Sequence, residues 1–228
     1  DEIKGGKAFI AVQHYNVQQH QYRGRGFTTV YWPQPQFHGF NDYLRLIGVR
    51  QVGDEQGEQP GEVLLDRSHA NLMLDTQVNR SAFREHDPQQ VSRPFLIRVA
   101  SDGLSSTSPI TSRLGELLFI WGSRFTTEEG QLTKLGLTCS VLATTSDRTW
   151  SYAWSGGNIP EESFAEPGET PLGRQPLALL LDGSFPAVEI KKDESGRETL
   201  AAAAPGSSAA PGKLLLAGCS EMFKNAYL

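Results

Sequence analysis

Short apolar runs that end abruptly at polar turns are the main pattern along this chain. Residues 176–181 are apolar and lead into Asp182, Gly183 and Ser184, and residues 213–217 form a second run of this kind. Runs of about four to eight apolar residues between turn residues are typical of strands buried on both faces. We predict further strands at residues 7–12, 62–66, 71–74, 94–100, 137–144 and 187–191.

Two stretches have helical spacing instead. In residues 40–47 the apolar side chains recur at steps of three and four, and Gly48 can end the helix. A second helix is predicted after Thr126 or Thr127, whose side chain can cap it, and Gly136 can end it. Because strands and helices alternate, we predict an α/β fold with a mainly parallel sheet flanked by helices. Such sheets bind ligands at the carboxyl ends of their strands.

Long polar stretches between these elements predict loop insertions. Residues 110–120 fit a helix that leads into a strand, and the low-complexity stretch at residues 193–212 predicts a flexible loop. The irregular stretches that we predict are residues 17–37, 49–61, 81–94, 101–108 and 145–170.

The composition fits one folded domain, residues 1–228, with a candidate sub-boundary near residues 101–112. Hydrophobic residues make up 38% of the chain, which is well above the content of a disordered sequence. The net charge of -5 argues against nucleic-acid binding, because phosphate binding needs a basic face. No apolar run approaches the roughly 20 residues that a membrane-spanning helix requires.

The two cysteines, Cys139 and Cys219, lie in apolar, strand-like surroundings. Two buried free thiols are the favoured interpretation, and a single disulfide stays open because sequence does not give the Cα separation. Cys219 lies between the predicted strand at residues 213–217 and a helix predicted to start near Ser220, where a thiol can act as a nucleophile. However, Glu221 and Met222 follow it and no histidine lies downstream, so we favour a structural role for Cys219.

Other reactive residue types do not form a complete catalytic or metal-binding set. His14 and His20 are too far apart for a typical zinc pair and lack a nearby third ligand. Asp66, Ser68 and His69 offer acid, hydroxyl and imidazole, but neighbours on an extended chain rarely face one another. We therefore predict turn and capping roles for Asp66, Ser68 and His69. We predict no catalytic residue, metal or cofactor in this chain.

The best candidates for ligand or partner binding are two pairs of residues. Trp150 and Trp154 flank Tyr152 in a stretch predicted to be a loop, where they form an exposed aromatic patch or anchor the loop on the core. Asp182 and Ser184 follow a predicted strand and can bind a polar group or simply turn the chain.

Several segments resemble the GldG-like auxiliary component of an ABC-type, gliding-motility-associated transport system. The similar order is a short helix, a Gly-Val pair and a strand that ends in Asp, followed by a Thr-Ser segment with Trp150. At Cys219 the family pattern has an acidic residue instead, which argues further against catalysis there. The segments that carry the resemblance are residues 5–7, 40–49, 62–66, 108–111, 121–125, 142–146 and 176–186.

This resemblance implies a fold similar to class I glutamine amidotransferases (flavodoxin-like), without their catalytic residues. It implies an extracytoplasmic domain on the periplasmic side of the inner membrane, anchored by helices that this fragment lacks. An ABC permease and an ABC ATPase would be its partners. Nucleic acid is not an expected partner.

Three functional hypotheses follow. The first is a non-catalytic accessory domain of an ABC-type transport system. The second is a carbohydrate- or peptide-binding module that uses the Trp150–Trp154 stretch, for which a glycan or peptide would quench tryptophan fluorescence. The third is a hydrolase or amidotransferase-like enzyme that uses Cys219, which would then react rapidly with thiol reagents at neutral pH.

Overall fold

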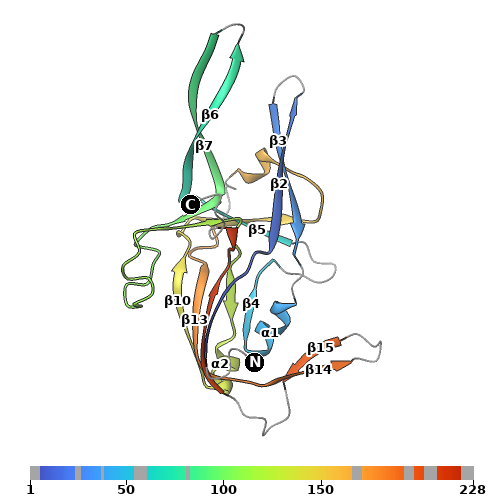
Figure 1. Cartoon of the computed structure of the whole chain (residues 1–228), viewed down its shortest axis with the longest axis vertical. Coiled ribbons are helices and arrows are strands. Elements are labelled where there is room, and N and C mark those ends of the chain that lie inside the picture. Colours follow the sequence, from blue (N-terminus) through green and yellow to red (C-terminus); the bar gives the residue numbers. More distant parts are fainter. Residues whose placement is uncertain are drawn as a thin grey trace.

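The structure is a computed structural model that describes residues 6–23, 27–36, 39–53, 61–80, 83–165, 171–192, 198–202 and 210–221. Strands dominate the described residues. The α-helices among them are short: α1 (Phe40–Leu46) and α2 (Glu129–Leu135) have 7 residues each. Figure 1 shows an elongated molecule in which two hairpins project from one end and a four-stranded sheet forms the other half.

The four-stranded sheet has the order β1-β16-β13-β10. Its first two strands are parallel, and its other two pairings are antiparallel. Leu179 and Leu181, alternate residues of β13, are fully buried and cluster with Leu44 of α1 and Leu132 of α2. The bounds are β1 (Lys7–Ala11), β16 (Ala210–Ala217), β13 (Pro176–Phe185) and β10 (Leu137–Thr144).

One hydrophobic core, which we call the leucine core, fills the space between this sheet and the helices. Two short strands, β4 (Val49–Gln51) and β9 (Phe125–Thr127), pair beside α1 and complete it. Burying one such side chain contributes about 1.5–3 kcal/mol. The buried residues of the leucine core are Leu44, Ile47, Val49, Phe125, Leu132, Leu137, Leu179, Leu181, Phe185, Leu214 and Leu216.

A second core, which we call the aromatic core, is built around Tyr31, Phe95, Trp121 and Phe164. The rings of Phe95 and Trp121 stack at a centroid distance of 4.0 Å, and Tyr31 meets Phe164 at 5.3 Å. The strands that form this half are β2 (Tyr15–Arg23), β3 (Phe27–Pro35), β5 (Gly61–Asp66), β6 (His69–Arg80), β7 (Phe83–Val99), β8 (Leu117–Ile120), β11 (Thr149–Trp154) and β12 (Ile159–Pro160), with the 3-10 turn η1 (Glu161–Phe164).

The predicted mainly parallel, helix-flanked sheet of the amidotransferase or flavodoxin type is wrong. Between the described strands, the pairing of β1 with β16 is parallel and every other pairing is antiparallel. A central antiparallel strand covered on both faces has the same continuous apolar run as a parallel one, so the run alone did not distinguish them.

Three predicted loops are strands instead. Residues 17–37 contain most of the β2–β3 hairpin, residues 83–94 of the predicted loop 81–94 belong to β7, and residues 145–170 contain β11 and β12. Pro33 and Pro35 suggested a loop, but β12 pairs only with Val30 and Tyr31, so the proline segment has a strand on one side only. Proline is tolerated at such positions because no ladder bond is lost on the open side.

Other local predictions are confirmed in part. Helix α1 ends before Gly48, which has φ 77°, and α2 ends before Gly136, which has φ 65°. Neither predicted threonine caps α2, because its N-cap residue is Glu128. Strand β8 confirms the strand part of residues 110–120, and turns precede it.

The segment predicted as a flexible loop, residues 193–212, is partly described. It contains strand β15 (Glu198–Ala202), which pairs with β14 (Val188–Lys192), and the first residues of β16. The single-domain assignment and the sub-boundary near residues 101–112 stay predictions. Within the described part of the chain, no helix is both long and apolar enough to span a membrane.

Candidate functional site

The most densely hydrogen-bonded group in the described structure is the carboxylate of Asp66, at the end of β5. This side chain is fully buried. Its Oδ2 accepts from the Thr149 hydroxyl at 2.6 Å and from the N–H and the hydroxyl of Ser146 at 3.0 Å each. Its Oδ1 accepts from the N–H of Ser68 at 2.7 Å and from the Ser68 hydroxyl. A buried carboxylate is tolerated only when such donors replace water.

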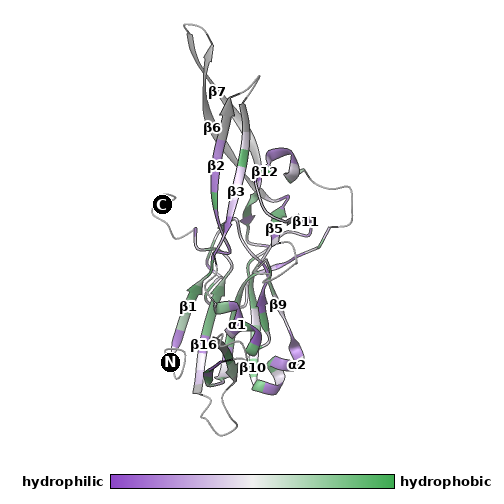
Figure 2. Ribbon diagram, turned by 90° about the vertical axis from the view of Figure 1, so that its right-hand side faces the viewer, coloured by the Kyte–Doolittle hydropathy of each residue, from purple (hydrophilic) through white to green (hydrophobic). Residues whose placement is uncertain are grey.

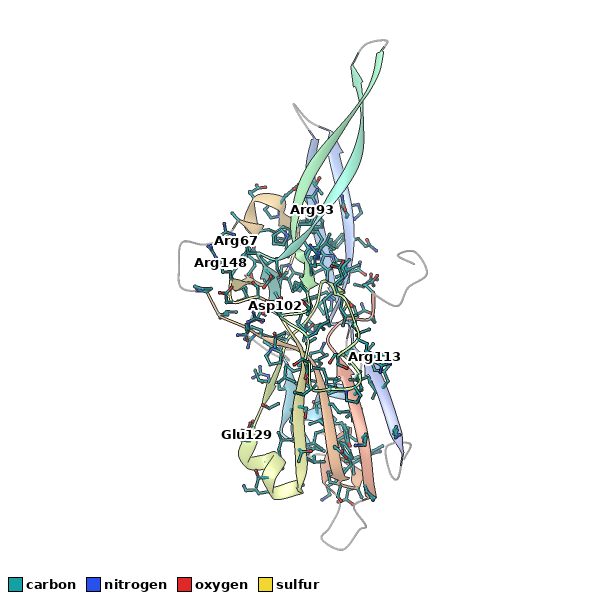
Figure 3. All side chains as sticks on the ribbon, turned by 90° about the vertical axis from the view of Figure 1, so that its left-hand side faces the viewer. Arg67, Arg93, Asp102, Arg113, Glu129 and Arg148 are labelled. Carbon is teal, nitrogen blue, oxygen red and sulfur yellow. The ribbon has the colours of Figure 1, made fainter. Side chains whose placement is uncertain are left out.

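This arrangement ties three turns together. The Thr149 hydroxyl also lies 2.6 Å from the hydroxyl of Thr145, which accepts from the N–H of Gln175 at 2.8 Å. The backbone N–H of Arg67 donates to the carbonyl of Arg148, and Figure 3 shows both arginines at the same edge of the molecule. The predicted turn role of Asp66 is confirmed by its bond to the N–H of Ser68, two residues on, which is the pattern of an Asx turn.

Asp66 and Ser68 do meet, although the sequence argument expected neighbours to point apart. The meeting occurs because the chain turns at Arg67 rather than staying extended. The side chain of His69 lies outside the described residues. The Asp66 carboxylate accepts hydrogen bonds from groups of the protein itself. The role of this site is therefore to connect the turns rigidly.

Cys219 is fully buried and bonds to the backbone of Ile120. Its Sγ accepts from the Ile120 N–H at 3.3 Å and donates to the Ile120 carbonyl at 3.2 Å. Gln13 holds the same two segments, because its Nε2 donates to the Trp121 carbonyl at 3.2 Å and its Oε1 accepts from the Ser220 N–H at 2.9 Å. This geometry favours a structural thiol over a nucleophile, since a nucleophile must be accessible.

The second cysteine, Cys139, is half-buried on β10, and both cysteines are free thiols. The prediction that both thiols are free is therefore confirmed, its burial part holds fully for Cys219 alone, and the alternative of a disulfide between them is wrong. Burial, with a smaller contribution from Glu129, raises the pKa of the Cys139 thiol to about 11. Cys139 is accordingly protonated and weakly reactive at neutral pH.

Trp150 and Trp154 lie on strand β11 rather than on a loop. Trp150 is 8% exposed and belongs to the aromatic core. Trp154 packs edge-on against Tyr15 at 5.4 Å, and its Nε1 donates to the Gly157 carbonyl at 2.9 Å. With Tyr152 half-buried between them, the alternation is that of an inward-facing strand side. The geometry supports the anchoring interpretation, and a binding role for these residues stays a prediction.

Asp182 and Ser184 lie within β13, which continues to Phe185 instead of turning after Leu181. The predicted turn at Gly183 is therefore wrong. Gly183 has φ 143°, and a Cβ there would lie 2.4 Å from the Gly136 carbonyl oxygen, so glycine lets two backbones approach. Asp182 forms an ion pair with Lys213 on the adjacent strand. A ligand-binding role for Asp182 and Ser184 stays a prediction.

The two histidines considered for metal binding are far from equivalent. His14 is 2% exposed and packs edge-on against Tyr15, whereas His20 is exposed on the β2–β3 hairpin. Among the side chains that the structure describes, no group of three or more His, Cys, Asp and Glu residues is placed to hold a metal ion.

The exposure of Trp32, an aromatic residue on β3, was not predicted from the sequence. Its side chain is 47% exposed, in contrast to the 8% of Trp121 and Trp150. It lies opposite Gln18 of β2 and 6.3 Å from the ring of His20. Figure 2 shows that β2 is hydrophilic over much of its described length. Tyr31 and Pro33 are buried and Trp32 between them is exposed, but residues 30–33 contain no polar residue, so the sequence has no alternation of polar and apolar residues that could have revealed this strand.

Comparison with known proteins adds one finding. A protein-family model described as an ABC-type uncharacterized transport system matches residues 3–228. No curated protein matches the chain. No solved structure matches it either. The family match spans almost the whole chain, so it concerns the fold as a unit rather than a single motif.

Proposed function

We propose a non-catalytic accessory role for this chain, which belongs to the family of auxiliary components of an ABC-type uncharacterized transport system. The observation that carries the proposal is the family match over residues 3–228. ATP hydrolysis and passage of the substrate would be the tasks of other subunits. This chain would bind those subunits or present a surface to the transported substrate.

The geometry of the reactive residues supports this proposal. The Cys219 thiol is buried against Ile120, and the Asp66 carboxylate is saturated by hydroxyl and amide donors. Both groups are used to hold the fold together. The projecting β2–β3 and β6–β7 hairpins, in contrast, extend away from the body and suit contacts with other molecules (Figure 1).

We further propose that this chain is a GldG-like component and that its partners are an ABC permease and an ABC ATPase. The support for this proposal is the resemblance of the segments quoted above, including the Thr-Ser segment before Trp150. The same resemblance supports a location on the extracytoplasmic, periplasmic side of the inner membrane, with anchoring by helices outside this fragment, and a role linked to gliding motility.

Co-purification tests the accessory role. The full-length protein, tagged at one end, is purified from detergent-solubilised membranes of its native cells, and an unrelated tagged membrane protein serves as the control. Recovery of an ABC permease and an ABC ATPase with this protein alone is the expected result. Recovery without either subunit, under conditions that keep other ABC complexes intact, would contradict the proposal.

Thiol labelling tests the location separately. Ser106 is exposed, so S106C in a C139S background places one accessible thiol on the surface. A membrane-impermeant maleimide should label this variant in intact cells as fully as in lysed cells. The C139S parent controls for background, since Cys219 is buried. Labelling only after lysis would show a cytoplasmic location.

A further inference from the structure

The outward side of the β2–β3 hairpin, which we call the Trp32 face, has a chemistry that the accessory role does not explain. Residues paired across antiparallel strands point to the same side, and side chains alternate along each strand. Gln18 is paired with Trp32, so these two side chains define the face. The described residues of the Trp32 face are Asn16, Gln18, His20, Val30, Trp32 and Gln34.

At the base of the same hairpin, the opposite side is fixed to the body. Tyr31 is 1% exposed and contacts the rings of Phe95 and Trp121 at 5.0 and 5.4 Å. Tyr15 is 3% exposed, and Pro33 is buried as well. The Trp32 face is therefore supported by a packed layer beneath it. Such support lowers the entropy lost when a ligand binds.

Trp32 presents a large flat apolar surface at the centre of this face, with 47% of its side chain exposed. The ring can stack on another flat apolar surface. Exposed tryptophan is common at binding surfaces because its ring is apolar while its N–H group can stay in contact with water. Its neighbours Gln18, Asn16 and Gln34 each carry an amide, which both donates and accepts hydrogen bonds. The face thus offers one stacking platform with three amide side chains beside it.

The charge of the face restricts what it can recognise. None of its six described residues is Asp, Glu, Lys or Arg, although these types make up 21% of the chain. An anionic or cationic ligand would lose hydration without finding an opposite charge. An amphipathic helix would need several apolar anchors, and Val30 is the only other apolar side chain among these six.

We propose that the Trp32 face is a binding site for a neutral glycan. A pyranose ring has C–H bonds on its face and hydroxyl groups around its edge. The C–H face would stack on the indole of Trp32, and the hydroxyls would exchange hydrogen bonds with Gln18 and the adjacent amides. The hairpin projects from the body, so a long polysaccharide can lie along it (Figure 1).

Affinity electrophoresis tests this site directly. The protein is run in native gels that contain dextran, laminarin or hydroxyethyl cellulose, which are neutral polymers. At least one polymer should slow the wild-type protein, by a similar amount at about 0.05 M and about 0.5 M NaCl, because no charge takes part. Trp32→Ala should weaken binding about tenfold and Gln18→Ala about threefold, as for the loss of a stacking surface and of one hydrogen bond.

Ile190→Ala is the matched control, because Ile190 is 67% exposed but lies on β14. It should bind as the wild type does. Far-UV circular dichroism checks the fold of each variant, and Trp32→Tyr, which keeps a ring, should retain most of the binding. Protection of tryptophan fluorescence from acrylamide by the bound polymer should disappear in Trp32→Tyr.

Three results would overturn the site: no retardation of the wild type by any of the polymers, equal retardation of Trp32→Ala, or retardation that high salt abolishes. Binding of an unstructured peptide to Trp32 that no polymer displaces would assign the face to a protein partner instead. These outcomes are independent of the transporter role, because they need no other subunit.

Discussion

Gly218 and Ser123 lie so close that their backbones are in direct contact. The N–H of Ser123 donates to the Gly218 carbonyl at 2.7 Å, and a Cβ on Gly218 would lie 1.9 Å from the Ser123 carbonyl oxygen. This contact joins the end of β16 to the segment after β8, next to the bond between Cys219 and Ile120. It makes position 218 specific for glycine.

We expect Gly218→Ala to lower the free energy of unfolding by about 2–4 kcal/mol, because two backbone segments must separate to admit the methyl group. Urea denaturation measures the change. Gly130→Ala is the control, since Gly130 is in α2 with open space at its Cβ position. That substitution should stabilise by about 0.5–1 kcal/mol. Equal effects of the two variants would show that the contact with Ser123 is not tight.

Asp66→Asn should lower the free energy of unfolding by about 2–4 kcal/mol. The side-chain amide group of Asn would face hydroxyl and N–H donors that now bond to a carboxylate oxygen, so several donors would lose their acceptor. Asp102→Asn is the matched control. The Asp102 carboxylate is exposed and pairs with Arg174 at 2.8 Å, a hydrogen bond that lowers the pKa of Asp102. Loss of such a surface pair should cost less than about 1 kcal/mol. Similar costs for both variants in urea denaturation would contradict the buried-network interpretation.

Arg124 and Glu62 form a bidentate ion pair with distances of 2.8 and 3.0 Å, and each side chain is 19% exposed. Glu62→Gln should cost about 1–2 kcal/mol, because a partly buried guanidinium loses its charged partner. The pair of Arg98 and Glu116 offers the same chemistry at more than half exposure. Glu116→Gln should therefore cost less than about 0.5 kcal/mol, and thermal denaturation of the two variants measures the difference. A larger loss of stability for Glu116→Gln than for Glu62→Gln would contradict this prediction.

The two thiols should differ in how they respond to pH. The pKa of Cys139 is raised from 9.0 to about 11, so the folded state holds its proton more tightly than the unfolded state does. The stability that this preference contributes is present below pH 9 and is lost as the pH rises towards 11. Cys139→Ser should flatten the fall in melting temperature over this interval.

Reaction with a disulfide reagent reports on the same thiols. At pH 8 the thiolate fraction of Cys139 should be about a hundredfold below that of an unperturbed thiol, so its labelling should be slow. Cys219 should react only after denaturation, because it is buried. Rapid labelling of native Cys139→Ser would mean that Cys219 is accessible, and it would revive the enzyme hypothesis.

Local structure was predictable where one period dominates. The steps of three and four residues between Phe40 and Ile47 predicted α1, and glycine at position 48 predicted its end. The leucine run before Asp182 predicted a buried strand, although β13 extends beyond it. These signals are local, so the sequence alone contains them.

The pairing of strands was not predictable from such signals. The β2–β3 hairpin is rich in amides and contains proline, so its strand character depends on one side packing against Phe95 and Phe164. The Asp66 network joins positions 66 and 149, which are 83 residues apart. The role of Trp32 was missed for the same reason, since its exposure follows from the burial of Tyr31 beside it.

Tension applied between Lys7 and Ala217 would load the parallel pair of β1 and β16 in shear. The register runs from Lys7 opposite Lys213 to Ala11 opposite Ala217, so pulling on these two points slides one strand along the other. All the hydrogen bonds of the ladder then resist together, whereas peeling an antiparallel hairpin breaks them one at a time. A domain connected in this way can transmit force between the segments that flank it without opening.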